Sequence, residues 1–189
     1  MASAPTTSTA SLRADSARVR ERMLAAARER LAAGDLELPM NAIAKDAGVG
    51  VGTMYRHFPT RQTLLETLAS ESFEILVAQA KATPDGVEGL TELFRLALRR
   101  LLTDPSLAAV LATPTFECAE TVALSEELSG AFMQLLDRAR EAGTIRPDVT
   151  GDDLRRLMCG LQYAVRSGSD DDNKAADRYL DILVKGLQP

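Results

Sequence analysis

Side chains that form hydrogen bonds gather in one short stretch of this sequence, residues 53–57. Thr53, Tyr55, Arg56 and His57 stand within five positions, and His57 is the only histidine among the 189 residues. Catalysis needs titratable groups that converge, and no cysteine or acidic pair stands beside His57 at a catalytic spacing. The same side chains can donate to base edges or hold phosphates. This stretch therefore favours binding of nucleic acid over catalysis.

Other catalytic or metal chemistry finds no support in the residue types. Cys118 and Cys159 have no second Cys or His at metal-ligand spacing, so we expect two reduced thiols and no metal site. There is no glycine-rich phosphate loop after a strand, and no run of about 20 apolar residues that could span a bilayer. Residues 1–11 lack the apolar core of a secretory signal. We expect a cytoplasmic protein that is not an enzyme, needs no cofactor and does not contact a membrane.

Two short helices are expected to position residues 53–57. Met40–Ala47 carries apolar residues at helical spacing, Gly48–Gly50 forms a turn, and Val51–Phe58 follows with Met54 and Phe58 on one face. Gly48 accepts left-handed backbone angles at little steric cost. This arrangement is typical of the helix-turn-helix, whose second helix enters the major groove of DNA. Thr53, Arg56 and His57 then point outward, with Tyr55 on the flank.

The rest of the chain reads as further helices, because apolar residues recur with helical spacing and no segment alternates with a period of two. Residues 1–15 are expected to be a disordered tail, and a helix starts at Ser16 and stops at Gly34. Thr60 is a plausible N-cap for a helix that reaches about Lys81. The remaining expected helices cover Leu90–Leu102, Pro105–Leu111 with Asp104 as cap, Val122–Ala142, a helix capped by Thr150, and a last one ending near Leu187. The fold class is all-α.

Charge is divided unevenly along the chain. The whole sequence carries −5, whereas residues 1–66 hold nine Lys and Arg against seven Asp and Glu, leaving +2 there and −7 in the remainder. A polyanion can therefore be approached only by the N-terminal segment. We expect Arg18, Arg20, Arg22 and Arg61 to supply charge to the phosphate backbone, and Arg56 to read a base.

Two motifs resemble a known family. Ile43–Val49, followed by Gly52–Arg61 and then by Leu64-Leu65, is similar to the DNA-binding domain of the TetR family of bacterial transcriptional regulators, over about residues 16–70. The resemblance implies that Thr53, Tyr55 and His57 face DNA and that Arg61 contacts the backbone. Pro39 stands where the family usually has a capping Thr, and Gly50 replaces a common Ser, so both changes could weaken phosphate anchoring. The expected DNA-binding residues are Thr53, Tyr55, Arg56, His57, Arg61, Gly52, Arg18, Arg20 and Arg22.

The resemblance also implies a domain organisation and a mechanism. Residues 16–62 would form the helix-turn-helix domain, the helix over 61–81 would connect it, and residues 63–189 would bind an effector and dimerise. A palindromic operator requires a two-fold protein. The wide apolar stripes of the last two helices predict a homodimer interface at Leu154, Leu157, Leu161, Tyr179, Leu183 and Leu187.

A small, largely apolar effector is expected to bind among the middle helices and release the repressor from DNA. The predicted lining is an apolar set with a few polar groups: Phe94, Leu98, Phe116, Phe132, Met133, Met158, Gln162, Tyr163 and Arg166. An alternative remains open, in which the C-terminal domain binds no effector and only dimerises or binds a protein partner. The sequence does not identify the effector, the operator, or whether an effector induces or co-represses.

Overall fold

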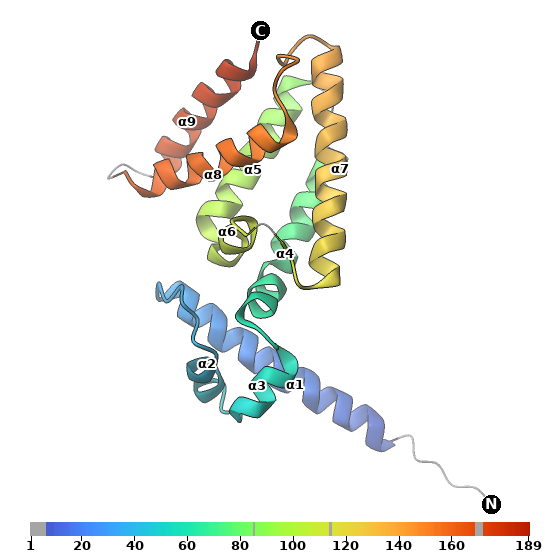
Figure 1. Cartoon of the computed structure of the whole chain (residues 1–189), viewed down its shortest axis with the longest axis vertical. Coiled ribbons are helices and arrows are strands. Elements are labelled where there is room, and N and C mark those ends of the chain that lie inside the picture. Colours follow the sequence, from blue (N-terminus) through green and yellow to red (C-terminus); the bar gives the residue numbers. More distant parts are fainter. Residues whose placement is uncertain (1–6, 85, 114, 169–171) are drawn as a thin grey trace, which may run out of the picture. The chain divides into compact units, whose positions relative to one another are not determined.

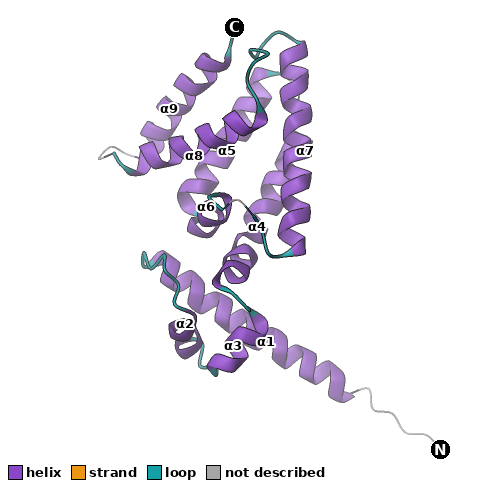
Figure 2. Cartoon of the chain, in the orientation of Figure 1, coloured by secondary structure: helices purple, strands orange, loops and turns teal. Residues whose placement is uncertain are grey.

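The computed structural model describes residues 7–84, 86–113, 115–168 and 172–189. Within these ranges the chain forms nine helices joined by loops, and no strand (Figure 2). The all-α prediction is confirmed. The chain divides between Leu68 and Ala69 into two compact units, which we call the N-terminal unit and the C-terminal unit and describe separately.

The N-terminal unit holds α1 (Thr7–Ala32), α2 (Met40–Asp46), α3 (Val51–His57) and the first part of α4 (Arg61–Ala82). Helix α2 packs against both α1 and α3 (Figure 1). Apolar side chains from each helix fill the core: Met23 of α1, Ile43 of α2 and Met54 of α3 are fully buried, as is Phe58 just after α3. Their burial fixes the orientation of α3, because removing any of them would leave a cavity.

Helix α1 begins earlier than the sequence predicted. It starts at Thr7, so residues 7–15 of the expected tail are helical, while residues 1–6 lie outside the described part. Residues 11–18 are all exposed, so burial does not account for this turn of helix. Alanine and leucine have high helix propensity, and Arg18 forms an i,i+3 ion pair with Asp15 at 3.5 Å. Local propensity therefore extends α1 beyond its packed part.

The C-terminal unit contains the rest of α4 together with α5 (Val87–Thr103), α6 (Pro105–Leu111), α7 (Ala119–Glu141), α8 (Gly151–Arg166) and α9 (Asp172–Leu187). Helix α5 is central, since α6, α7, α8 and α9 all pack against it (Figure 1). Ala80, Leu93 and Leu135 form one buried cluster that joins α4, α5 and α7. These helices surround the cavity described below.

Two predicted N-caps are confirmed in this unit. Asp104 accepts hydrogen bonds from the backbone N–H groups of Ser106 and Leu107 at the start of α6, and its second carboxylate oxygen accepts one from Ser72 Oγ of α4 at 2.5 Å. Thr150 and Asp153 form a reciprocal capping box at the start of α8. Capping satisfies backbone donors that a helix leaves without partners, so both caps fix where these helices begin.

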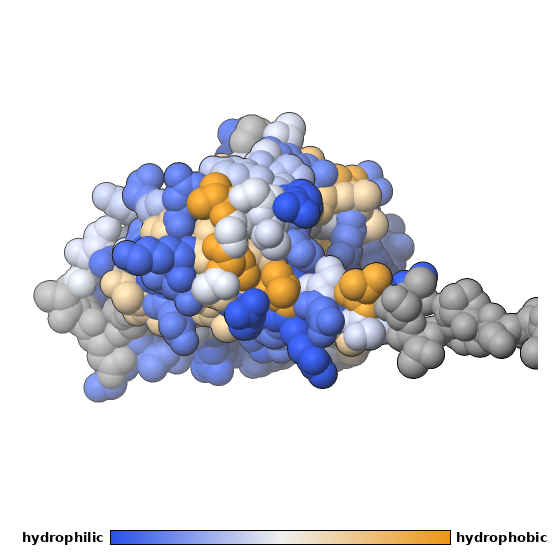
Figure 3. All heavy atoms as spheres, turned by 90° about the horizontal axis from the view of Figure 1, so that it is seen from below, coloured by the Kyte–Doolittle hydropathy of each residue, from blue (hydrophilic) through white to orange (hydrophobic). Residues whose placement is uncertain are grey.

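One face of the molecule is largely polar (Figure 3). Viewed from below Figure 1, hydrophilic side chains surround a few separate apolar patches (Figure 3). Among the described residues, no helix combines the length and the hydropathy needed to cross a membrane.

Candidate DNA interface and effector cavity

The turn between α2 and α3 has the geometry that the sequence predicted. Gly48 adopts φ +63°, in the left-handed region that a side chain would strain. The N–H of Val49 donates to Ala44 O at 2.9 Å, which closes the turn. Buried Ile43 and Met54 hold the two helices together on the inner side. The opposite side of α3 is therefore left free to face outward.

The outer side of α3 presents a mixed set of donors. Tyr55 is 45% exposed, and Arg56 is exposed with its Nε donating to Gly52 O at 3.2 Å. Thr53 and His57 are half-buried at the edges of this surface. A Cβ added to Gly52 would meet nothing within 4 Å, so a flat backbone surface is open there. Five of the predicted DNA-contacting residues thus share one helix, with Tyr55, Arg56 and Gly52 the most accessible.

The arginines expected to contact phosphates have different surroundings. Arg22 is exposed, and Arg18 is exposed beside Asp15. Arg20 instead lies 4.9 Å over the Phe58 ring and donates to Thr67 Oγ1 at 3.3 Å. Arg61 donates from Nε to Glu37 O at 2.8 Å and from Nη2 to Leu36 O at 2.5 Å. Arg20 and Arg61 therefore have contacts inside the N-terminal unit that the sequence did not predict, and Arg61 supports the loop between α1 and α2.

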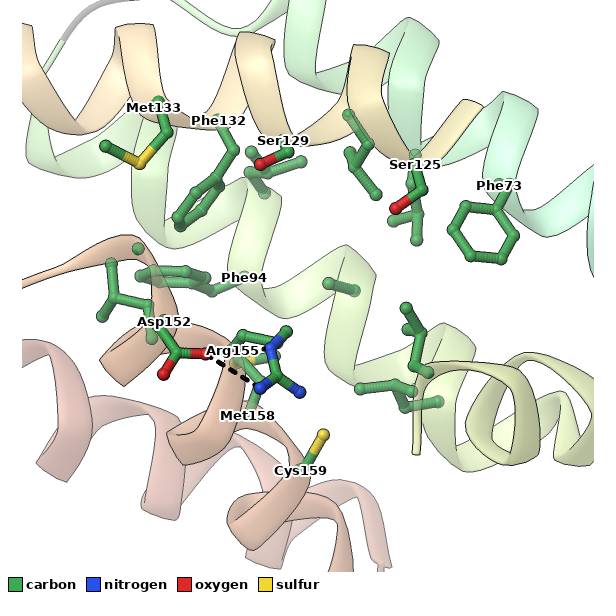
Figure 4. Close-up of a pocket in the computed structure, with 18 residues that line it drawn as sticks. Phe73, Phe94, Ser125, Ser129, Phe132, Met133, Asp152, Arg155, Met158 and Cys159 are labelled. Atoms are coloured by element: carbon green, nitrogen blue, oxygen red, sulfur yellow. Dashed lines mark hydrogen bonds and ion pairs between the residues drawn. The ribbon is translucent and has the colours of Figure 1, made fainter. Parts of the chain in front are cut away.

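A second candidate site lies entirely within the C-terminal unit. It is a cavity of about 530 Å³, surrounded by side chains of α4, α5, α6, α7 and α8. The close-up in Figure 4 shows Phe94 of α5 and Phe132 of α7 side by side at one end and Phe73 of α4 at the other. Most of the lining is aliphatic or aromatic. A volume of this size and character is typical of a small-molecule site.

Four of the nine residues predicted to line this cavity do so: Phe94, Phe132, Met133 and Met158. The other five do not. Leu98 is buried in the core, and Phe116 packs edge-on against the Phe73 ring, with centroids 6.2 Å apart. Tyr163 is 74% exposed on α8. Gln162 and Arg166 donate to the backbone carbonyls of Leu101 and Leu102, so they hold α8 against the end of α5.

Sequence reasoning missed the polar residues that do reach the cavity. They are Ser125 and Ser129 on α7 and Asp152, Arg155 and Cys159 on α8. A helical face offers a signal for this, because Asp152, Arg155 and Cys159 recur at i, i+3 and i+7 and flank Met158. Gln162 and Arg166 follow Arg155 by seven and 11 residues and lie on nearly the same face of α8, but they are beyond the cavity, beside the end of α5.

The predicted dimer residues differ in how far they are buried in the single chain. Leu154, Leu161 and Leu187 are buried within their own protomer, and Tyr179 and Leu183 are half-buried. Leu157 is 42% exposed and remains available for an interface. The structure adds Ile182 of α9 and Tyr163 of α8 as large exposed apolar side chains on the same two helices.

Neither unit shows a metal site among the residues that the structure describes. Cys118 and Cys159 are both half-buried. Two hydrogen bonds hold the pKa of Asp153 below its usual range. The larger effect comes from the Thr150 hydroxyl and the smaller one from the Thr150 N–H. This carboxylate therefore stays ionised in its cap.

Comparison with known proteins gives matches to both units. A family model for bacterial regulatory proteins of the tetR family matches residues 23–68, and one for a transcriptional regulator SbtR-like C-terminal domain matches residues 85–189. The HTH-type transcriptional regulator SAUSA300_2515 of Staphylococcus aureus is 32% identical over 65 residues, 34% of this chain. That segment covers only 35% of the relative, so the match spans about a third of its length.

Solved structures agree with this result over most of the chain. The TetR transcriptional regulator SCO0520 from Streptomyces coelicolor is 30% identical, with a TM-score of 0.53 and coverage of 90% of this chain and 98% of that one. A tetR-family regulatory protein from Rhodococcus RHA1 shares the fold at 17% identity, with a TM-score of 0.64 and coverage of 90% and 97%. The helix-turn-helix geometry and these matches agree, and the chain belongs to the TetR family of transcriptional regulators.

Proposed function

We propose that this regulator represses transcription by binding a palindromic operator as a homodimer, and that a small molecule in the C-terminal cavity releases it. The observation that carries the proposal is the outer side of α3, where Tyr55 and Arg56 are exposed on a helix fixed by buried Ile43 and Met54. Such a helix can enter the major groove with its side chains against base edges. The proposal places the protein in the cytoplasm, together with the DNA it regulates.

A two-fold operator follows from a two-fold protein. One α3 contacts only a few base pairs, and two copies related by symmetry would read two half-sites. Helices α8 and α9 supply the interface in this proposal, because Leu157 and Ile182 are large apolar side chains exposed on the single chain. Covering them in a dimer removes apolar surface from water.

Release by an effector requires that the effector bind one conformation more tightly than the other. The cavity of about 530 Å³ can differ in its affinity for an effector between two conformations, because its walls come from five different helices. One of them is α4, which continues without a break from Arg61 in the N-terminal unit. A ligand that rearranges these walls changes the position of α4. The cavity also favours an effector-controlled regulator over the alternative in which the C-terminal domain binds no effector and only dimerises or binds a protein partner.

The experiment is a selection of operator sequences from a random duplex library. Wild-type protein is expected to enrich an inverted repeat over successive rounds. The Tyr55→Ala, Arg56→Ala double variant should enrich no sequence although its circular dichroism spectrum is unchanged, because both side chains are exposed. Arg99→Ala, which removes an exposed arginine from α5, is the matched control and should select the wild-type repeat. Enrichment of the same repeat by the double variant would reject α3 as the reading helix.

A further inference from the structure

The polar groups of the cavity are concentrated on two opposite walls. Ser125 and Ser129 stand one turn apart on α7, and Asp152 and Arg155 project from the first turns of α8 across from them (Figure 4). The rings of Phe94 and Phe132 lie between these walls with centroids 5.7 Å apart. A bound molecule would therefore place its apolar body against the rings and its polar end near α8 or α7.

Arg155 is the one cationic side chain that reaches the cavity in the described part of the chain. Its Nε and Nη2 both donate to Asp152 Oδ1, at 3.2 and 2.8 Å. About half of the Arg155 side chain is exposed, so this pair stands at the edge of the cavity and is accessible to solvent. An exposed ion pair contributes little to stability, and exchanging the partner of Arg155 costs little.

Asp152 has a second cationic partner outside the cavity. Its other oxygen, Oδ2, lies 2.8 Å from Nη2 of Arg156, which does not line the cavity. The Asp152 carboxylate thus forms ion pairs with two guanidinium groups. The neighbouring acid, Asp153, is occupied elsewhere, because its Oδ2 accepts from both the hydroxyl and the N–H of Thr150. If Arg155 bound another anion, Asp152 would keep Arg156 and no charge would be left unpaired.

We propose that the effector is an amphipathic carboxylic acid whose carboxylate binds Arg155 and whose apolar part fills the cavity. The inference rests on the proposed effector function of this cavity. A carboxylate matches the planar guanidinium with two parallel hydrogen bonds. An amine would instead meet an Asp152 already shared by two cations. A neutral alcohol could bond to Ser125 or Ser129 but would gain nothing from the charge of Arg155.

The test compares acids with alcohols of the same carbon frame by isothermal titration calorimetry on the full-length, DNA-free protein. The pairs are octanoate and 1-octanol, decanoate and 1-decanol, and 4-phenylbutanoate and 4-phenyl-1-butanol. For the pairs that bind, the wild type is expected to prefer the acid by about tenfold, the value of one charge-assisted hydrogen bond. Arg155→Met should remove this preference and leave the alcohols unaffected. Asp152→Asn should increase it, because Arg155 then loses its competing carboxylate.

A second readout locates the bound acid. In a Cys118→Ser background, a saturating acid should slow alkylation of Cys159 by iodoacetamide, since Cys159 lines the same cavity. Equal affinities for acid and alcohol, together with protection of Cys159 by both, would overturn the acid inference and leave the effector cavity standing. Absence of binding by every pair, with Cys159 unprotected, would overturn the effector function and this inference with it. Acid binding that Arg155→Met does not weaken would also overturn it.

Discussion

Replacing Arg61 with alanine should lower the stability of the folded protein, whether or not DNA is present. The two hydrogen bonds from its guanidinium to the carbonyls of Leu36 and Glu37 hold the loop that ends at Leu38. Leu38 is fully buried although its φ is +47°, a conformation that costs a residue with a side chain roughly 1–2 kcal/mol. The loop keeps this conformation because contacts on both sides of Leu38 restrain it.

The magnitude follows from the number and setting of these bonds. A hydrogen bond to a charged group contributes about 1.5–3 kcal/mol when buried, and the exposure of Arg61 reduces this to roughly 0.5–1 kcal/mol for each bond. Arg61→Ala should therefore lower the free energy of unfolding by about 1–2 kcal/mol in urea denaturation followed by circular dichroism. Arg56→Ala is the matched control, since the Arg56 guanidinium donates to Gly52 O in its own helix, and this substitution should cost less than about 0.5 kcal/mol.

The salt dependence of DNA binding separates support of the loop from contact with a phosphate. If Arg61 only supports the loop, Arg61→Ala leaves the slope of log affinity against log salt unchanged. Loss of a phosphate contact would reduce that slope by about 0.9. A variant that is as stable as Arg56→Ala and shows the reduced slope would refute this account of Arg61.

Three further predictions concern the C-terminal unit. Ser72→Ala should lower the free energy of unfolding by about 1–3 kcal/mol, because Ser72 is buried and Asp104 Oδ2 loses its donor; a change below about 0.5 kcal/mol in urea denaturation would contradict the role of this bond. Asp153→Asn should lower the melting temperature at neutral pH, and the difference from wild type should shrink as the pH falls below about 4: the lowered pKa of Asp153 means that its stabilisation is present above its usual pKa and lost on protonation. A difference that stays constant down to about pH 2 would count against the capping box. Leu157→Asp with Ile182→Asp should convert a dimer into a folded monomer in light scattering, since both side chains are exposed on the single chain; an unchanged dimer would exclude this face of α8 and α9.

The sequence predicted where most helices begin and end, because these positions are determined by residues close to them in the chain. Gly48 marks the turn, Asp104 and Thr150 mark helix starts, and each acts on backbone groups within a few residues. The start of α1 was wrong for a related reason. The small polar residues at the start of the chain offer little surface to bury and so predict a disordered tail, whereas helix propensity and the Arg18–Asp15 pair extend α1 back to Thr7 without burial.

The cavity was predicted less well because its lining depends on where along each helix the neighbouring helices pack. Phe94, Phe132 and Met158 are large apolar residues that any inward face would include. Which polar residues accompany them depends on where along α8 the cavity lies. Arg155 and Arg166 are about three turns apart on nearly the same face, and Arg155 lines the cavity whereas Arg166 lies beyond it, beside the end of α5. No spacing in the sequence showed that Arg166 would bond to the carbonyl of Leu102 on α5.

The arginines of the N-terminal unit illustrate the same limit. Composition predicted a basic surface but could not distinguish exposed Arg22 from Arg20, which stacks on Phe58 and donates to Thr67. A cation–π contact joins residues far apart in the sequence, so it becomes visible only in the fold. The number of phosphate contacts is therefore expected to be smaller than a count of arginines indicates.

The central claim is that α3 reads a particular DNA sequence. It is tested most directly by fluorescence anisotropy with two duplexes of equal length, the selected inverted repeat and a scrambled version of it, at about 150 mM salt. Wild-type protein is expected to bind the repeat at least about 10³-fold more tightly than the scrambled duplex, and Arg56→Ala is expected to reduce this ratio by a factor corresponding to about 1–3 kcal/mol. Equal affinity for the two duplexes, or a ratio that Arg56→Ala and Tyr55→Ala both leave unchanged, would contradict the central claim.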